Sequence, residues 1–314
     1  MEIIRLTHPH NLKQIELPEM VLALGYFDGV HKGHKKVIQT AKEKAKEFNL
    51  KSGVMTFDPH PSVVLRKNSK PIQLLTPVQK KIHLIQELSV DYIFVVQFTE
   101  DFADLLPQQF IDQYIINLNV KHVVAGFDFT YGKLGKGTME TLPFHSRDFF
   151  NHTIVEKQTD HDRKISSTLI RELIQSGNVE YAHQLLGRPH GSTGTVIHGE
   201  KRGSKIGFPT ANIFVNKDYI LPPTGVYAVK VQIEGESYNG VCNIGYKPTF
   251  HQEKSAQPSI EVHIFDFNSQ IYDLEIEFSW MKRIRSEKRF NSIDNLVKQI
   301  KRDKKEAYDY LRNI

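Results

Sequence analysis

The segment from Gly25 to His34 brings together residue types suited to binding phosphate. It reads GYFDGVHKGH, with glycines at 25, 29 and 33 and imidazoles at 31 and 34. We expect it to join a strand to a helix, and the first N–H groups of a helix, at its positive dipole end, favour an anion. His31 and His34 can then donate hydrogen bonds to phosphate oxygens. The alternative is a glycine-rich turn with two surface histidines, which a four-residue HxGH pattern alone does not exclude.

A second pattern suited to anions lies at residues 164–171, which read KISSTLIR. The hydroxyls of Ser166, Ser167 and Thr168 open an expected helix, and Arg171 follows them. These groups can bind anionic oxygens, with charge assistance from the guanidinium. A simple hydroxyl N-cap is the alternative, but the pairing with the HxGH turn favours a phosphate site.

Two further loops combine aromatic side chains with one carboxylate each. They read TFDPHP at 56–61 and GFDFTYG at 126–132, and each follows a predicted strand. Because ligands bind at the carboxyl ends of parallel strands, both loops are expected at the sheet edge that carries His31. Their aromatic rings suit a planar ligand, although ordinary loops packed by their own aromatics fit the spacing almost equally well.

In the second half, glycines at 194, 199, 203 and 207 are interspersed with Lys and Arg. This pattern predicts a flexible basic loop that can fold over polyphosphate, although it is not a Walker A sequence and a solvated surface loop is the alternative. Thr210 and Asn212 alternate on an extended segment, so both oxygens point the same way and could bind Mg²⁺. Glu261 and His263 share one face of a later predicted strand, where such pairs are usually solvent-facing.

The elements that must position these residues alternate between strand and helix in the first half. This order predicts a parallel sheet covered on both faces. The expected strands are 20–25, 52–57, 91–98 and 121–125, and the expected helices are 35–48, 107–118 and one that starts at Thr76-Pro77. Thr76 is the expected N-cap and Pro77 the first helical residue, after which Val78, Ile82, Ile85 and Leu88 recur at helical spacing.

The second half consists of short β-rich runs and one closing helix. The runs are 194–197, 211–215, 226–233, 238–244, 260–267 and 274–280, and the helix starts near Ser292. They predict a small antiparallel six-stranded β-barrel, or a sandwich, with Glu234-Gly235-Glu236 as a hairpin turn. The fold class is therefore α/β plus β, with domains at 1–186 and 187–314.

Composition limits the class of protein. The 314 residues suffice for two domains, and contents of 39% hydrophobic and 25% charged residues exclude a disordered or collagen-like chain. The lone Cys242 excludes an internal disulfide and multi-Cys metal sites, which suits a reducing cytoplasm. The sequence shows neither a secretory signal nor a run of 18 apolar residues, so we expect a cytoplasmic protein with no membrane segment.

The net charge of +5 favours anionic partners without identifying them. Phosphorylated metabolites and nucleic acid both fit, but the chain carries no RNA- or DNA-binding motif. We therefore expect small-molecule substrates and no nucleic acid, and keep a basic nucleic-acid-binding protein as the alternative from another class. The absence of HExxH or a comparable ligand set argues against a metal-dependent hydrolase. The oligomeric state stays open.

Nine motifs along the chain resemble, in the same order, those of the bacterial bifunctional riboflavin kinase/FAD synthetases. GYFDGVHKGH, TFDPHP, GFDFTYG and KISSTLIR look like their FMN adenylyltransferase module, a Rossmann-like domain of the HxGH nucleotidyltransferase superfamily. GFPTAN, LPPTGVYAV, GVCNIGYKPTF, SIEVHIFDF and IRSEKRF look like their riboflavin kinase module. The resemblance implies conversion of riboflavin to FMN and of FMN to FAD, with ATP and Mg²⁺. A chain with only one active module, the other binding flavin or regulating, is the nearest alternative.

The resemblance also implies roles for individual residues. In the first half, those assigned to ATP are Gly25, Phe27, Asp28, His31, His34, Ser166, Ser167, Thr168 and Arg171, and those assigned to FMN are Asp58, Pro59, Phe127 and Asp128. In the second half, those assigned to ATP are Gly199, Gly203, Lys205, Gly207, Thr210 and Asn212, and those assigned to flavin are Asn243, Gly245, Arg285, Glu287 and Phe290. Thr210 and Asn212 would hold Mg²⁺, and Glu261 would be the general base.

The two reactions differ in their need for a base. A phosphate nucleophile is already ionised at neutral pH, so adenylyl transfer needs positioning and charge neutralisation. The riboflavin hydroxyl is a very weak acid and needs a carboxylate to accept its proton. The chain departs from the family pattern at Phe127, Ser204, Lys247 and Asp273. Lys247 keeps the charge of an arginine but loses its bidentate fork.

Overall fold

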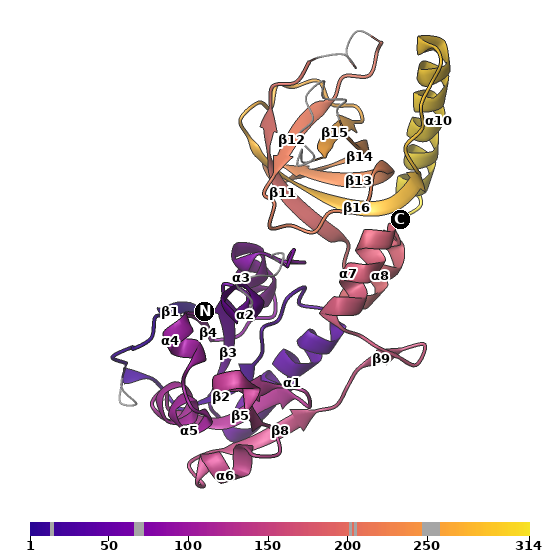
Figure 1. Cartoon of the computed structure of the whole chain (residues 1–314). Helices are drawn as coiled ribbons and strands as arrows, with labels where there is room; N and C mark the ends of the chain where they lie inside the picture. Colours follow the sequence, from indigo (N-terminus) through magenta and orange to yellow (C-terminus); the bar gives the residue numbers. More distant parts are fainter. Residues whose placement is uncertain (13–15, 66–71, 201–202, 204–205, 247–257) are drawn as a thin grey trace. The chain divides into compact units, whose positions relative to one another are not determined.

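The computed structural model describes residues 1–12, 16–65, 72–200, 203, 206–246 and 258–314 (Figure 1). By its internal contacts the chain divides into two compact units, Met1–Ser167 and Thr168–Ile314. The first unit is built on a parallel sheet and the second on a closed antiparallel barrel, so the expected fold class is confirmed.

A six-stranded parallel sheet forms the centre of the first unit. Its strands are β1 (Glu2–Leu6), β2 (Met20–Leu24), β3 (Lys51–Asp58), β4 (Tyr92–Gln97), β5 (Val120–Gly126) and β8 (Asn151–Val155). They lie in the order β1-β4-β3-β2-β5-β8, with every neighbouring pair parallel. The four predicted strands occupy the middle of the sheet. The edge strands β1 and β8 were not predicted, because an edge strand with exposed positions lacks the continuous apolar run of a buried one.

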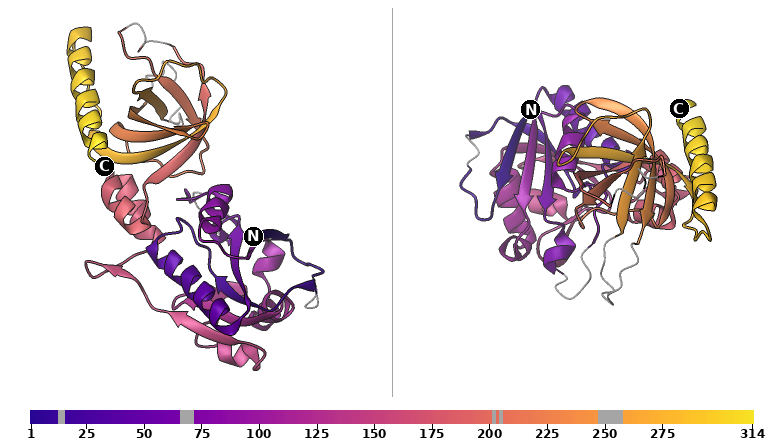
Figure 2. Two further views of the ribbon diagram at one scale, coloured as in Figure 1. Left: turned by 180° about the vertical axis from the view of Figure 1, so that it is seen from behind. Right: turned by 90° about the horizontal axis from the view of Figure 1, so that it is seen from above.

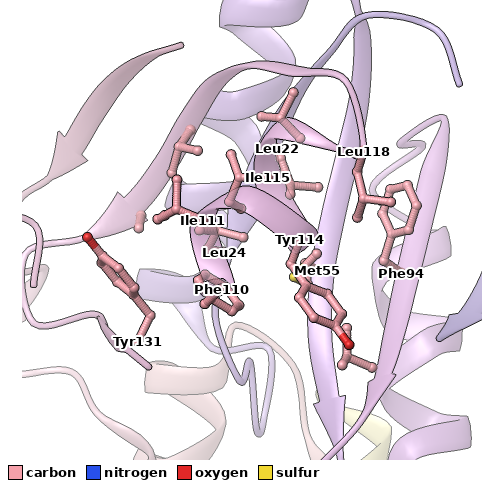
Figure 3. Close-up of a cluster of buried hydrophobic side chains, with 14 of the residues drawn as sticks. Leu22, Leu24, Met55, Phe94, Phe110, Ile111, Tyr114, Ile115, Leu118 and Tyr131 are labelled. Atoms are coloured by element: carbon pink, nitrogen blue, oxygen red, sulfur yellow. The ribbon is translucent and has the colours of Figure 1, made fainter. Parts of the chain in front are cut away.

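Helices cover both faces of this sheet. They are α1 (Lys32–Phe48), α2 (Pro61–Leu65), α3 (Val78–Gln86), α4 (Glu100–Ala103), α5 (Pro107–Ile111) and α6 (Leu142–Ser146). On one face, Ile38 of α1 and Ile85 of α3 pack on Val54. On the other, Tyr114 and Ile115 pack over Leu22, Met55 and Phe94 (Figure 3). Short hairpins complete the unit: β6 (Thr130–Tyr131) with β7 (Gly137–Thr138), and β9 (Thr159–Asp160) with β10 (Arg163–Lys164).

Two local expectations in this unit were wrong. The residues 107–118 do not form one α-helix, because α5 ends at Ile111 and a π-helical turn follows at Asp112–Ile116. Thr76 does not cap α3, since the N-cap is Pro77, which makes no side-chain capping bond. The Thr76 hydroxyl instead accepts a hydrogen bond from the Gly29 N–H at 2.8 Å, so a contact distant in sequence takes the group that a local cap would use.

The second unit is a closed barrel with helices outside it. Two helices, α7 (Ser167–Ser176, whose first residue closes the first unit) and α8 (Val179–Leu186), precede the barrel strands β11 (His190–Ile197), β12 (Ala211–Val215), β13 (Gly225–Ile233), β14 (Glu236–Gly245), β15 (Ser259–Ile264) and β16 (Glu275–Arg285). The strands close in the order β11-β12-β15-β14-β13-β16. The predicted hairpin is confirmed: Ile233 pairs with Glu236, and Glu234 and Gly235 both have positive φ.

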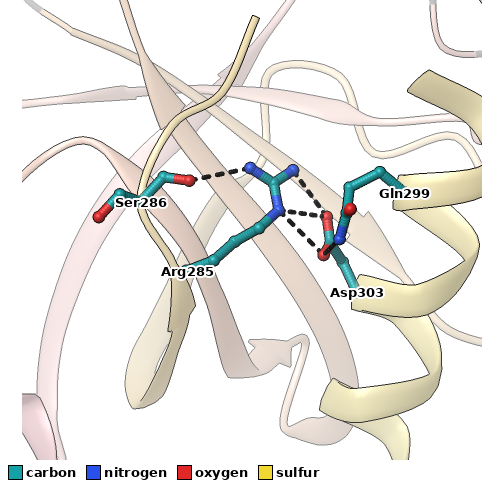
Figure 4. Close-up of polar contacts among 4 residues, drawn as sticks. All are labelled: Arg285, Ser286, Gln299 and Asp303. Atoms are coloured by element: carbon teal, nitrogen blue, oxygen red, sulfur yellow. Dashed lines mark hydrogen bonds and ion pairs between the residues drawn. The ribbon is translucent and has the colours of Figure 1, made fainter. Parts of the chain in front are cut away.

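The terminal helix α10 (Ile293–Arg312) begins at its N-cap Ser292, as predicted, and runs along the outside of the barrel (Figure 2). Its Ala307 and Leu311 pack on Val226 and Met281. A buried ion pair adds to this contact: Arg285 of β16 donates from Nε and Nη2 to the Asp303 carboxylate at 2.7 to 3.0 Å (Figure 4). The guanidinium and the carboxylate are thereby both satisfied where α10 meets the barrel.

Two candidate active sites

The HxGH segment joins β2 to α1 as predicted, and His31 is the N-cap of α1. Its Nδ1 accepts a hydrogen bond from the His34 N–H at 3.2 Å, so a neutral His31 ring carries its proton on Nε2. The two imidazole rings stack with their centroids 3.5 Å apart. This stack places both rings over the first turn of the helix, where the N–H groups and the dipole favour phosphate.

The backbone before His31 is held in an unusual conformation. Phe27 and Val30 have φ of 56° and 39°, values that L side chains rarely adopt. Gly25 is required by close packing, because a Cβ there would lie 2.7 Å from the Phe27 ring. Such strain persists where surrounding contacts fix it and is concentrated at functional sites.

Asp28 supplies those contacts. Its carboxylate is buried and accepts hydrogen bonds from the backbone N–H groups of Leu75 and Thr76 at 3.2 and 2.9 Å. The Thr76 hydroxyl also donates to it at 3.3 Å. The side chain thus fastens the β2–α1 loop to the residues that precede α3. Its assignment to ATP remains a prediction, and this geometry gives the carboxylate a structural role.

Ser167 brings the KISSTLIR segment to the same loop. Its Oγ donates to the Asp28 carbonyl at 2.8 Å, a contact between residues 139 positions apart in sequence. Ser166 is half-buried beside it. Thr168 and Arg171 belong to the second unit, and their contacts with ATP stay predictions.

The two aromatic loops follow β3 and β5 at the carboxyl edge of the sheet, as predicted. Asp58 ends β3 and is half-buried, and Pro59 follows it. Phe127 and Asp128 are exposed, and both contact Lys164: its Nζ forms an ion pair with Asp128 and lies 4.6 Å from the centre of the Phe127 ring. Lys164 therefore joins the GFDFTYG loop to the KISSTLIR segment, a role that the sequence did not indicate.

The sequence-based predictions did not include Lys81 on α3 among the site residues. Its ammonium is fully buried and donates to the Tyr26 carbonyl, the Thr56 hydroxyl and the Phe57 carbonyl at 3.0, 3.0 and 3.2 Å. Burial lowers the pKa of Lys81 to about 8, and the carboxylates of Asp28 and Asp58 oppose that change. A sequence signal existed, because Lys81 stands three residues after Val78, on the apolar stripe of the helix.

In the barrel, strand register brings the predicted kinase residues into one row. Asn212 of β12 pairs with Glu261 of β15, and Glu261 pairs with Asn243 of β14. On the next strand Val226 pairs with both Asn243 and Arg285. The neighbours Ile213, Ile260 and Ile244 lie in the barrel core, so alternation puts the whole row on the outer face.

The glycine-rich segment packs against the start of this row. A Cβ on Gly199 would lie 2.0 Å from the Asn212 amide nitrogen, and one on Gly203 would lie 2.3 Å from the Phe208 carbonyl oxygen. Gly207 has φ of 85°, in the region that favours glycine. At Gly199 and Gly203 the absence of a side chain lets the backbone of this segment approach Asn212 and Phe208 closely. Lys205, Ser204 and Lys247 lie outside the described residues.

Of the residues predicted to contact flavin, Gly245, Asn243 and Glu287 come together. A Cβ on Gly245 would lie 2.9 Å from a Glu287 carboxylate oxygen and 3.3 Å from the Asn243 amide nitrogen. Phe290 lies 5.8 Å from the Arg285 guanidinium, measured to the ring centre. Arg285 itself donates to Asp303 and to the Ser286 carbonyl, and its contact with flavin stays a prediction.

His263 shares the outer face with Glu261, as predicted, but it is not solvent-facing. Its Nδ1 donates to the Pro209 carbonyl at 2.8 Å, and its Nε2 lies 3.3 Å from the Lys304 ammonium of α10. Burial is the main cause that lowers the pKa of His263, and the positive charge of Lys304 adds to it. The neutral ring links α10 to the residue that precedes Thr210.

The described part of the chain lacks two features, a membrane-spanning helix and a metal-binding cluster of side chains. No helix there is long and apolar enough to cross a bilayer. No group of three or more His, Cys, Asp or Glu side chains in the described residues could hold a metal ion.

Two family models match the chain in succession. One described as FAD synthetase matches residues 13–169, and one described as riboflavin kinase matches residues 186–311. The matches include eight of the nine motifs in full, and the KISSTLIR motif as far as residue 169.

Individual relatives agree with these matches. The chain is 57% identical over 314 residues to the bifunctional riboflavin kinase/FMN adenylyltransferase of Bacillus subtilis, covering 100% of this chain and 99% of that protein. It is 48% identical, over the same shares, to the protein of that name from Listeria monocytogenes. Among solved structures, one titled macrolide-efflux protein from Streptococcus pneumoniae is 35% identical, with a TM-score of 0.84 over 96% of this chain and 97% of that one.

Proposed function

Because the chain belongs to the family of bifunctional riboflavin kinase/FMN adenylyltransferases, we infer that it makes FAD from riboflavin in two ATP-dependent steps. It phosphorylates riboflavin to FMN and adenylylates FMN to FAD with release of pyrophosphate. The observation that carries this conclusion is the match of both family models, in order, to the two parts of the chain.

We propose that adenylyl transfer takes place at the carboxyl edge of the parallel sheet. The ionised phosphate of FMN attacks the α-phosphorus of ATP, and the bond to the departing pyrophosphate breaks. No protein base is needed, so the site acts by positioning and by stabilising charge. The first turn of α1, with Nε2 of His31, supports binding of the ATP phosphates. Ser166, Ser167, Thr168 and Arg171 are proposed to assist, and Asp58, Pro59, Phe127 and Asp128 to face FMN.

Phosphoryl transfer is proposed at the outer-face row of the barrel. Glu261 accepts the proton of the riboflavin 5′-hydroxyl as its oxygen attacks the γ-phosphorus of ATP, with ADP as the leaving group. Asn212 on the neighbouring strand and Thr210 just before it are proposed to face the ATP phosphates. Asn243, Gly245 and Glu287 form a group suited to polar contacts with flavin.

The residues of the row fit a magnesium ion delivered with ATP. Thr210 and Asn212 offer a hydroxyl and an amide oxygen, the hard donors that Mg²⁺ accepts. The absence of a Cβ at Gly199 lets the glycine-rich segment lie directly against the Asn212 side chain. Bound there, the ion would neutralise charge on the transferring phosphates. Each module is proposed to form one domain, 1–186 and 187–314. The start of the kinase model at residue 186 supports this division, whereas internal contacts divide the chain after Ser167.

Product analysis tests the function directly. Purified protein is incubated with riboflavin, ATP and Mg²⁺, and FMN and FAD are separated by chromatography over time. We expect FMN to appear first and FAD to follow. Formation of FMN without FAD, or of FAD from supplied FMN without any kinase activity, would show that one module is inactive and favour the alternative of a binding or regulatory domain. Failure to form either product would refute the function.

A further inference from the structure

Lys81 is a buried charge that the proposed adenylyl transfer does not use. Its side chain is 1% exposed, and removing an ammonium from water is costly unless hydrogen bonds replace those of the solvent. Its three hydrogen-bond acceptors lie at the carboxyl ends of two adjacent strands, β2 and β3. These strand ends lead into the HxGH loop and the TFDPHP loop.

The contacts form a bridge between the two loops. Lys81 Nζ donates to the carbonyls of Tyr26 and Phe57, at 3.0 and 3.2 Å, and to the Thr56 hydroxyl at 3.0 Å. That hydroxyl in turn donates to the Tyr26 carbonyl at 2.8 Å. The Tyr26 ring also covers the ammonium, whose Nζ lies 4.0 Å from the ring centre.

A second link connects the same helix to the HxGH loop. The Asp28 carboxylate accepts from the backbone of Leu75 and Thr76, just before α3, while Lys81 on α3 holds Tyr26, two residues before Asp28. With the bond from the Gly29 N–H to the Thr76 hydroxyl, the loop is therefore fixed to the α3 segment through Tyr26, Asp28 and Gly29. Only the Lys81 contact also reaches β3 and the loop that carries Asp58.

We propose that Lys81 is a positioning residue for adenylyl transfer, which sets the distance between the loop that binds ATP and the loop that binds FMN. This inference rests on the function proposed for the first unit. In-line attack requires the phosphate oxygen of FMN and the α-phosphorus of ATP to approach to about 3–3.5 Å before reaction. A small change in loop spacing misaligns these atoms, although each loop keeps the contacts to its own substrate.

The test is the substitution Lys81→Met, which keeps a long apolar stem and removes the donors. We expect kcat for FAD formation from FMN to fall about tenfold to a hundredfold, while KM for ATP and for FMN each change by less than about threefold. Formation of FMN from riboflavin by the same preparation should be unchanged and reports the intact second unit. Lys42→Met is the matched control, because Lys42 also donates to a backbone carbonyl, that of Leu88, at the opposite edge of the sheet.

Two outcomes would overturn the inference. The first is that Lys81→Met unfolds cooperatively like a folded protein and has a kcat for FAD formation within about twofold of that of the unaltered chain. The other is a rise in KM for one substrate with kcat unchanged, which would make Lys81 a support for one loop only. If Lys81→Met does not fold, the inference is tested with Thr56→Val. This variant removes the hydroxyl that accepts from Lys81 and donates to the Tyr26 carbonyl, and it should lower kcat by a smaller factor. An unaltered chain that forms no FAD would refute the proposed function instead.

Discussion

Glu261 on β15 lies directly opposite Asn212 on β12, on the outer face of the barrel. The pairing places a carboxylate beside an amide at the point where the glycine-rich segment packs against the strand. This pairing suits the proposed roles of Glu261 as base and Asn212 as a group facing the ATP phosphates, because proton acceptance and phosphoryl transfer occur at neighbouring atoms.

Replacing Glu261 should separate the two activities. We expect Glu261→Gln to lower kcat for FMN formation by about a hundredfold or more, because the amide cannot accept the hydroxyl proton. FAD formation from supplied FMN should be retained. Both rates are measured by chromatography on one preparation, with Glu275→Gln, an exposed carboxylate on β16, as the control. A full kinase rate in Glu261→Gln would show that another group is the base.

Thr210→Val should weaken the use of MgATP by the kinase. Loss of the hydroxyl oxygen is expected to raise KM for MgATP in FMN formation roughly tenfold, the cost of one contact to a charged group. A magnesium titration of the rate should shift to higher concentration, whereas FAD formation should not change. Thr195→Val, at a strand position paired with Glu275, is the control. An unchanged titration would exclude Thr210 as a ligand.

His31 is the N-cap of α1 and is proposed to bind phosphate, and two variants can separate these roles. His31→Ala removes both the N-cap of α1 and the ring, whereas His31→Asn replaces the ring but supplies a good N-cap. We expect both variants to lower the rate of FAD formation about a hundredfold, because a hydrogen-bond donor to developing charge is removed. Only His31→Ala should also lose about 1 kcal/mol of stability in thermal unfolding. If His31→Asn restores the rate, capping alone explains the requirement.

The pKa of Lys81 predicts opposite effects of pH on stability and on FAD formation. Burial lowers it from 10.5 to about 8 in the folded chain, with Asp28 and Asp58 as the facing carboxylates. Between these values the unfolded state binds more protons, so the free energy of unfolding should rise with pH relative to Lys81→Met. FAD formation should decline above about pH 8, because a neutral amine has two hydrogens for three acceptors. An identical pH profile in Lys81→Met would refute this.

The pair formed by Arg285 and Asp303 should stabilise the second unit. Their side chains are 15% and 5% exposed, so Asp303→Ala leaves a buried guanidinium unpaired and should cost about 3 kcal/mol in urea unfolding. Glu306→Ala, which breaks the exposed pair with Lys282 between the same helix and strand, should cost less than about 1 kcal/mol. Equal effects of the two variants would contradict a special role for the buried pair.

The sequence predicted those features whose cause is local. The strands of the sheet centre, the barrel strands and the hairpin turn at Glu234-Gly235 follow from residue patterns within a few positions. The HxGH motif likewise indicated its own position between β2 and α1. Thr76 shows the limit of local patterns, because its hydroxyl accepts a hydrogen bond from the distant Gly29 N–H and does not cap α3.

Tertiary structure alone decided which distant residues meet. The row of Asn212, Glu261 and Asn243 depends on strand register, and the bridge made by Lys81 depends on the packing of α3 against two strand ends. Neither follows from spacing along the chain, because register and helix packing are set by burying the whole apolar surface together. Short segments of the sequence therefore determine which residue types are available for chemistry. The distances between these residues are determined by the packing of the folded cores.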